Sequence, residues 1–165
     1  MNPRPRSLKA RALQWLAQRE HSRAELRRKL LPHARAAAVE GSEVADAAPR
    51  VDALLDWLEA NRYLSQERFV ESRVHARASR YGNLRIQQEL AQHGVALAPE
   101  AADALRHSEF ERARDVWARK YGADATPDAA TRARQARFLI GRGFSSEVVR
   151  RVLRAAGRAV TDDEH

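Results

Sequence analysis

Arginine side chains recur at helical spacing in the middle of the chain, and their chemistry is the binding of anions. Arg73, Arg77 and Arg80 stand at i, i+4 and i+7, and Arg85 follows them. On a helix this spacing places the first three on one face, where each guanidinium can donate two parallel hydrogen bonds to a phosphate or a carboxylate. Like charges so placed repel by about 0.2–0.5 kcal/mol per pair, which an anionic partner would relieve. The alternative is a solvated face balanced by nearby glutamates.

A second basic group lies near the C-terminus, where the only acidic residue between 132 and 158 is Glu147. This imbalance favours a partner over a solvated face. We expect the contacts in this part of the chain to come from Arg132, Arg137, Arg150, Arg151 and Arg154.

The whole chain has the same character, with a net charge of +8 and a sequence pI of about 10.8. All but three of its 30 basic residues are arginine. Such a charge indicates an acidic partner. Coding by GC-rich DNA is an alternative explanation for the excess of Arg over Lys.

Residues for catalysis or metal binding do not form a recognisable pattern. The sequence has no cysteine, which excludes disulfides and thiolate sites, and its six histidines never stand at i, i+3 or i, i+4. No phosphate-binding loop or nucleophile elbow occurs, and glutamates such as Glu67, Glu71, Glu109 and Glu111 are interpreted as surface ion-pair partners. We expect a protein that is not an enzyme and uses no cofactor or metal. Without an apolar run of about 18 residues, we expect it to be soluble, cytoplasmic and without a membrane partner.

Helices must position these arginines, because the large apolar residues follow a helical period throughout. The sequence predicts nine helices and no strands. Ser22 to Glu25 forms a capping box that opens the second helix, which should stop at Pro32. The segment from Ala34 to Ala48 should form a long connection. A second capping box, Ser108 to Glu111, should open a new helix, and Gly157 should lie beyond the end of the last one.

The nine helices group into three sets of three, which form a weak internal repeat. The boundaries we predict are 1–62, including the 34–48 connection, then 63–107 and 108–157, followed by a loose tail at 158–165. Three helices with few large side chains bury little surface alone, so neighbouring repeats should stack. The expected fold is therefore all-α, with three tandem three-helix repeats in an elongated, curved arrangement, and with a long binding track rather than a deep pocket.

Short motifs spread over most of the chain resemble those of one known family. Each motif is weak alone, but together they occur in the order and spacing of that family. They are Arg11–Leu13 with Arg19–Leu26, Tyr63–Leu64 with Arg68–Val70, Gly82–Ile86 with Glu89–Leu90, and Arg137–Leu139 with Arg142–Phe144 and Val149–Leu153.

These motifs resemble the RecX regulatory proteins, which modulate the RecA recombinase. The resemblance implies three tandem three-helix repeats that lie in the groove of the RecA filament on single-stranded DNA and contact successive protomers. It also implies restraint of ATP hydrolysis, strand exchange and co-protease activity, and so a place in homologous recombination, DNA repair and the SOS response. The connection at 34–48 is longer than in the family, and Ser65–Gln66 replaces an acidic pair.

We therefore expect a monomeric, non-enzymatic protein that binds the RecA filament and mainly inhibits it. Single-stranded or duplex DNA is a further candidate partner. The alternative is a basic helical module that binds nucleic acid without specific regulation of RecA, and a third interpretation is a helical adaptor with no link to DNA.

Overall fold

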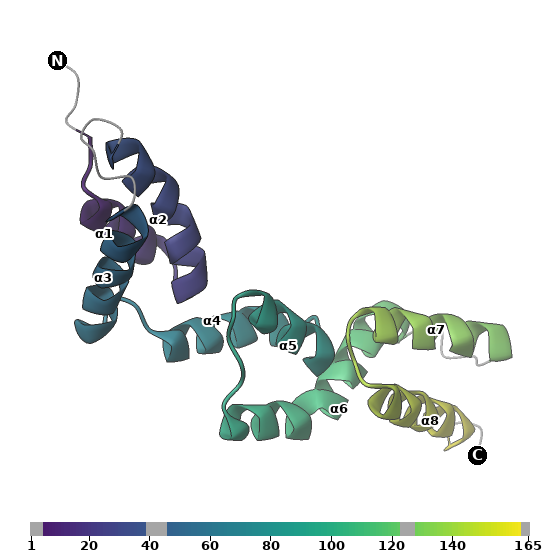
Figure 1. Cartoon of the computed structure of the whole chain (residues 1–165). Helices are drawn as coiled ribbons and strands as arrows, with labels where there is room; N and C mark the ends of the chain where they lie inside the picture. Colours follow the sequence, from purple (N-terminus) through teal and green to yellow (C-terminus); the bar gives the residue numbers. More distant parts are fainter. Residues whose placement is uncertain (1–4, 39–45, 123–127, 163–165) are drawn as a thin grey trace. The chain divides into compact units, whose positions relative to one another are not determined.

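The computed structural model describes residues 5–38, 46–122 and 128–162, and in these ranges it contains helices and no strand (Figure 1). The all-α prediction is confirmed. The eight helices are α1 (Leu8–Gln18), α2 (Arg23–Ala38), α3 (Ala47–Ala60), α4 (Gln66–Ala78), α5 (Asn83–Gln92), α6 (Pro99–Tyr121), α7 (Ala129–Gly141) and α8 (Ser146–Asp162).

The chain divides into two compact units. The N-terminal unit comprises Met1–Ser72 with His93–Val95, and the C-terminal unit comprises Arg73–Gln92 with Ala96–His165. The N-terminal unit therefore contains α1, α2, α3 and the start of α4, and the C-terminal unit contains the end of α4 and the other four helices.

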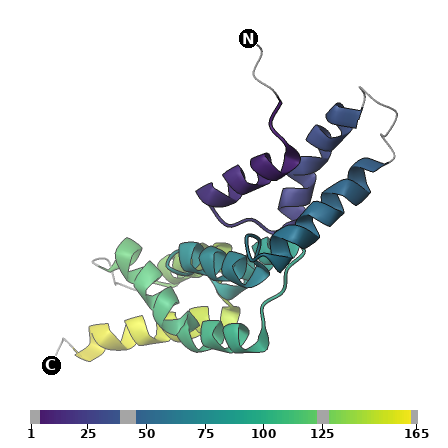
Figure 2. The same ribbon diagram turned by 90° about the vertical axis from the view of Figure 1, so that its left-hand side faces the viewer.

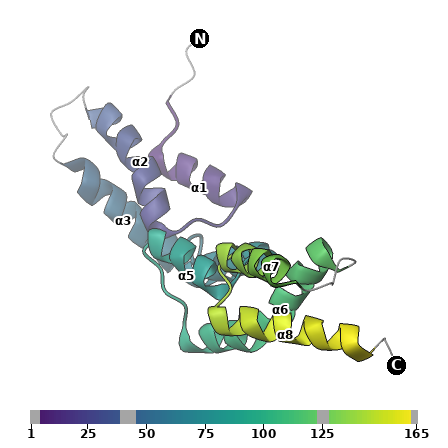
Figure 3. The same ribbon diagram turned by 90° about the vertical axis from the view of Figure 1, so that its right-hand side faces the viewer.

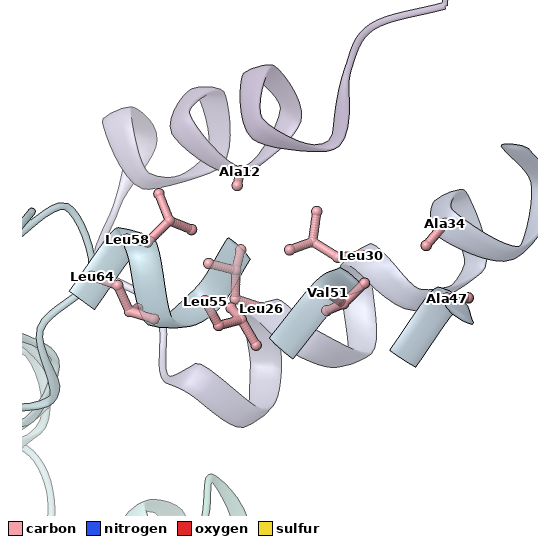
Figure 4. Close-up of a cluster of buried hydrophobic side chains, with 9 residues drawn as sticks. All are labelled: Ala12, Leu26, Leu30, Ala34, Ala47, Val51, Leu55, Leu58 and Leu64. Carbon is pink, nitrogen blue, oxygen red and sulfur yellow. The ribbon is translucent and has the colours of Figure 1, made fainter. Parts of the chain in front are cut away.

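The core of the N-terminal unit lies between α2 and α3, with α1 packed on α2 (Figure 2). Figure 4 shows leucines from both helices pointing toward one another, with Leu26 and Leu30 from α2 meeting Leu55 and Leu58 from α3. Ala12 of α1 completes the cluster and is fully buried. A small residue at this position lets the helices approach closely, so a chain with few bulky side chains still forms a dry core.

Pro32 does not end α2, as the sequence predicted, because the helix continues through it to Ala38. A proline inside a helix costs about 3 kcal/mol. Here the extra turn buries Ala34 and Ala38, and Ala34 joins the core cluster together with Ala47 of α3. This packing offsets part of the cost. The predicted connection at 34–48 is thus helical at both ends, and its central part, 39–45, lies outside the described residues.

Ser22 caps α2 as predicted, since its Oγ accepts a hydrogen bond from the Glu25 amide at 3.1 Å. The other half of the capping box is absent, because the Glu25 carboxylate pairs instead with Arg19. Burial by itself raises the pKa of Glu25, but the hydrogen bond from Arg19 and the electrostatic interactions with His21, Arg19 and His93 together outweigh it and hold the pKa below its usual value. The Arg19 pair thus anchors the α1–α2 turn to the start of α2.

His21 lies in the same turn and is almost fully buried. Its Nδ1 is 2.9 Å from the Arg19 carbonyl oxygen, and its Nε2 is 3.1 Å from Nζ of Lys29. The carbonyl can only accept and the ammonium can only donate, so the ring is neutral, with its proton on Nδ1. Burial lowers the pKa of His21 below its ordinary value.

This histidine makes the N-terminal unit sensitive to acid. Because the pKa of His21 is lower in the folded than in the unfolded state, its contribution is fully present above the unfolded value of about 6.5 and is lost as the pH falls through the folded value. We expect amide hydrogen-exchange protection of Leu26 and Leu30 to weaken as the pH falls below about 6.5, and His21→Asn to be less stable at pH 7 but to lose less stability on acidification. If protection in His21→Asn falls with pH as steeply as in the natural chain, other titratable groups cause the loss.

The core of the C-terminal unit lies where α6, α7 and α8 pack together (Figure 3). Ala113 and Val116 of α6 meet Leu139 of α7 and the apolar face of α8, with Phe144 from the turn between α7 and α8. The valines of α8, Val148, Val149 and Val152, follow the i, i+1, i+4 pattern of a buried helical stripe.

Two predicted helix ends in this unit are wrong. The structure joins the helices expected on either side of Ser108 into the single helix α6, because the Ser108 hydroxyl donates to the Leu105 carbonyl at 3.2 Å instead of capping a new helix. Helix α8 continues past Gly157 to Asp162. The boundaries of the three repeats stay a prediction.

Among the described residues, no helix has both the length and the apolar character needed to span a membrane.

Candidate functional site

Two turns of the C-terminal unit dock on each other through their backbones. The Gly82 amide, between α4 and α5, donates to the Arg142 carbonyl at 2.9 Å, and the Leu84 amide donates to the Gly143 carbonyl at 3.1 Å. Arg142 and Gly143 form the turn that follows α7. Residues about 60 positions apart in the sequence are thereby held side by side.

Both turns require glycine, but for different reasons. A Cβ at Gly82 would overlap the backbone of Gly143 and Phe144, so the close approach of the two chains excludes any side chain there. Gly82 does not adopt a positive φ. Gly143 does, at +88°, and a Cβ on it would lie 2.5 Å from the Arg85 Cβ.

Tyr81 lies in the first of these turns, and three guanidinium groups surround its ring. The Cζ atoms of Arg77, Arg85 and Arg142 are 5.7, 4.3 and 5.4 Å from the ring centroid. Glu89 accepts from Nε of Arg77 at 2.9 Å and lies 3.9 Å from Nε of Arg85. Two of these cations share the Glu89 carboxylate and all three lie near one aromatic ring, which leaves an excess of positive charge.

A hollow of about 700 Å³ lies beside this cluster, between the end of α4, α6 and α7. Arg80, Arg119, Lys120 and Arg142 line it together with Ser79, Val116 and Phe138, and none of these lining residues is acidic. Nζ of Lys120 is 4.0 Å from the centroid of Phe138, and Cζ of Arg142 is 5.2 Å from it. We call Arg77, Arg80, Arg85, Arg119, Lys120 and Arg142 the basic site.

Buried polar residues of α6 hold the turns of the basic site in place. The Glu109 carboxylate accepts from the amides of Asn83 and Ser145, at 3.1 and 3.3 Å, so it lies at the start of both α5 and α8. Arg112, one turn later, donates to the carbonyls of Ala78 and Tyr81 at 3.1 and 2.8 Å. Burial lowers the pKa of Arg112, and the neighbouring Glu109 opposes that shift.

Glu109 is therefore not the surface ion-pair partner that the sequence suggested, since only 5% of it is exposed. A negative charge at two helix N-termini is stabilising, and its removal weakens the charge-assisted hydrogen bonds from the Asn83 and Ser145 amides. We expect Glu109→Gln to lower the free energy of unfolding by about 2 kcal/mol. The matched control is Glu111→Gln, which removes only an exposed pair with Arg114 and should cost less than about 1 kcal/mol. Urea denaturation followed by circular dichroism measures both, and equal losses would contradict the role of Glu109.

Comparison with known proteins gives the same family throughout. Residues 65–98 match the sequence model described as "RecX, second three-helix domain", and residues 107–153 match "RecX, third three-helix domain". A protein of Ralstonia nicotianae named "Regulatory protein RecX" is 48% identical over 162 residues, covering 97% of this chain and 94% of its own. Proteins of the same name from Leptothrix cholodnii and Herbaspirillum seropedicae are 51% and 52% identical, covering 96% and 93% of this chain and 92% and 94% of their own.

The chain belongs to the RecX family. The basic site takes residues from both matched RecX domains, because Arg77, Arg80 and Arg85 lie in the second and Arg119, Lys120 and Arg142 lie in the third. The docked glycine turns are thus the joint that brings the two RecX domains to one surface.

The structure brings together some of the arginines that the sequence proposed, in two places. Arg77, Arg80 and Arg85 meet in the basic site, while Arg73 is half-buried on α4. Arg151 lies over Phe110, with Cζ 4.6 Å from the ring centroid, and lines a smaller hollow with Arg154. The remaining three, Arg132, Arg137 and Arg150, are exposed and line neither hollow.

Sequence reasoning missed three members of the basic site. Arg119 and Lys120 lie at the end of α6, next to acidic segments, so they carried no local excess of charge. Arg142 lies in the basic stretch between 132 and 158, and no local pattern indicates that it joins the middle arginines. Its place between Gly141 and Gly143 was the available signal, since two glycines around a charged residue mark a turn that can pack tightly.

Proposed function

We propose that this chain is a non-enzymatic regulator that binds the RecA filament on single-stranded DNA and mainly inhibits its ATPase, strand-exchange and co-protease activities. The observation that carries the proposal is its membership in the RecX family over nearly its whole length, with relatives named regulatory proteins. It would act as a monomer in the cytoplasm, in recombination, DNA repair and the SOS response.

The basic site supports the proposal because it suits an acidic surface. Six cations lie around two aromatic rings on one part of the C-terminal unit, with Glu89 as a paired carboxylate. Arg142 contacts both rings, so Tyr81 and Phe138 form one continuous patch with it. Such a surface steers and orients a negatively charged partner, and the arginines of α8 give a second point of attachment that raises avidity.

The second candidate function is binding to nucleic acid alone, which the same arginines favour. The two are separated by titrating the labelled chain against RecA-coated and naked oligo(dT), each at 50 and 200 mM salt. Six to ten phosphate contacts lose about 10³- to 10⁵-fold in affinity over this range, whereas a mixed protein interface loses less. We expect tighter binding to the coated strand, with the shallower salt dependence. Equal or tighter binding to naked DNA with a steep dependence would favour the second function.

A further inference from the structure

The N-terminal unit contains a groove that the basic site does not use. It has a volume of about 750 Å³ and lies between the start of α1, the end of α2 and the first half of α3. Its lining combines two chemistries, since cations of α1 and α3 lie beside exposed alanines of α2 and α3. We call it the α1–α3 groove.

The charge of the α1–α3 groove is of one sign. Arg6, Lys9, Arg11 and Arg50 line it, and none of the described residues of its lining is acidic. The reason lies in how α3 distributes its charges. Its carboxylates face α2, where Arg23 pairs with Asp56 and Glu59 at 2.8 and 2.9 Å, and Arg27 pairs with Asp52 at 2.7 Å. On the opposite side of α3, the described residues that line the groove include no neutralising carboxylate.

The rest of the lining is apolar and open to solvent. Ala36, Ala37 and Ala53 are exposed there, and Leu8 and Leu54 are half-buried beside them. Small side chains on neighbouring helices leave a shallow trough into which larger side chains of a partner fit. An apolar trough rimmed by polar groups on a soluble protein marks an interaction site.

An exposed aromatic pair extends this surface. Trp57 stacks on Tyr63, with ring centroids 5.6 Å apart, and Nζ of Lys9 lies 3.6 Å from the Trp57 centroid. The two residues are 37% and 49% exposed. Lys9 also lines the groove, so groove and rings are continuous. Tryptophan, tyrosine and arginine are the residues that dominate protein–protein binding energy.

We propose that the α1–α3 groove binds an acidic amphipathic segment of a partner protein. Apolar side chains of the segment fill the trough over Ala36, Ala37 and Ala53, and its carboxylates meet Arg11 and Arg50 at the rim. A nucleic-acid backbone matches this surface less well, because it would pair with the cations but leave the apolar trough open to water. The site lies in the N-terminal unit and is independent of the basic site and of the function proposed for it.

A designed peptide tests the proposal on the full chain. The probe is a fluorescein-labelled peptide of about 14 residues of Glu and Leu, with the leucines at i, i+3, i+4 and i+7. A second peptide has the same composition in an order that spreads the leucines around the helix. By fluorescence anisotropy at about 0.15 M salt, we expect saturable binding of the first peptide and at least about tenfold weaker binding of the second.

Variants locate the binding site. Arg11→Glu combined with Arg50→Glu should weaken the amphipathic peptide at least about tenfold. The matched control is Arg28→Glu combined with Arg114→Glu, which changes the net charge equally at exposed residues outside the groove and should change affinity less than about twofold. Far-UV circular dichroism of each variant establishes that the helices are retained. Amide chemical shifts of Ala36, Ala37 and Ala53 in the natural chain should move on titration.

Three results would overturn the proposal. One is the absence of saturable binding of the amphipathic peptide together with unmoved shifts in the groove. Another is equal affinity for both peptides, which would show that the groove recognises the charge of a peptide and not its amphipathic pattern. The third is displacement of the peptide by oligo(dT) of equal charge at an equal or lower concentration, combined with loss of oligo(dT) binding in the Arg11→Glu, Arg50→Glu variant. These two observations together would show that the groove binds nucleic acid.

Discussion

Replacing Gly82 by alanine is expected to lower the free energy of unfolding of the C-terminal unit by about 3 kcal/mol. The new Cβ would overlap backbone atoms of Gly143 and Phe144, which cannot rotate away as a side chain would. The two turns must separate, and the hydrogen bonds from Gly82 to Arg142 and from Leu84 to Gly143 are then lost. Urea denaturation followed by circular dichroism measures the loss, and hydrogen exchange at Leu84 and Ile86 locates it.

Gly141→Ala is the matched control for this substitution. Gly141 is two residues from Gly143 but ends α7 without a positive φ, and a Cβ on it would meet nothing within 4 Å. Alanine there should leave stability unchanged or raise it by about 0.5–1 kcal/mol. A Gly82→Ala variant as stable as Gly141→Ala would contradict the close docking of the two turns.

Reversing two charges of the basic site should weaken inhibition of RecA at least about tenfold, a change of about 1.4 kcal/mol or more in binding. Arg80→Glu with Lys120→Glu is the most informative pair, because both residues are exposed and line the same hollow. Arg77 is a poorer choice, since it is half-buried and its bond to the half-buried Glu89 supports the fold, so that reversing its charge could disturb the structure as well as binding. The measurement is the concentration needed for half-inhibition of RecA ATP hydrolysis on single-stranded DNA.

Arg28→Glu with Arg114→Glu again serves as the charge-matched control, since neither residue lines the hollow. It should inhibit RecA as the natural chain does. If both double variants lose inhibition equally, net charge rather than the basic site sets the affinity. If neither loses it, the contacts with RecA lie elsewhere on the chain.

Local sequence patterns predicted the parts of the fold that local physics determines. The helical period of Leu26, Leu30, Leu55 and Leu58 fixed which faces are buried, and these four side chains form the core of the N-terminal unit. Ser22 was correctly identified as a helix cap, because its amide partner lies three residues away. The i, i+4, i+7 spacing predicted that Arg77 and Arg80 share a helix face with Arg73, and it placed Arg85 only as the next arginine along the chain.

Contacts between distant segments decided what the sequence could not predict. The local pattern predicts that a helix ends at Pro32, but α2 continues to Ala38, where the packing of Ala34 and Ala38 in the interior stabilises the extra turn. Glu109 reads as a surface carboxylate, yet it receives the amides of Asn83 and Ser145, which lie 26 and 36 residues away. No local sequence pattern indicates that Asn83 and Ser145 are the partners of Glu109.

The basic site shows the same division between local and distant contacts. The helical spacing of Arg77 and Arg80 is visible in the sequence, whereas Arg142 reaches Tyr81 only because one glycine turn rests on another. A long-range pairing of this kind depends on the absence of side chains at Gly82 and Gly143. The sequence shows both glycines but not that they meet.

The measurement that tests the central claim most directly is ATP hydrolysis by RecA on single-stranded DNA, titrated with the natural chain at fixed salt. Regulation of the filament predicts loss of hydrolysis at ratios well below one chain per RecA, while binding of the same preparation to naked DNA stays weak. Unchanged hydrolysis at a stoichiometric excess, together with tight and salt-sensitive binding to naked DNA, would contradict it.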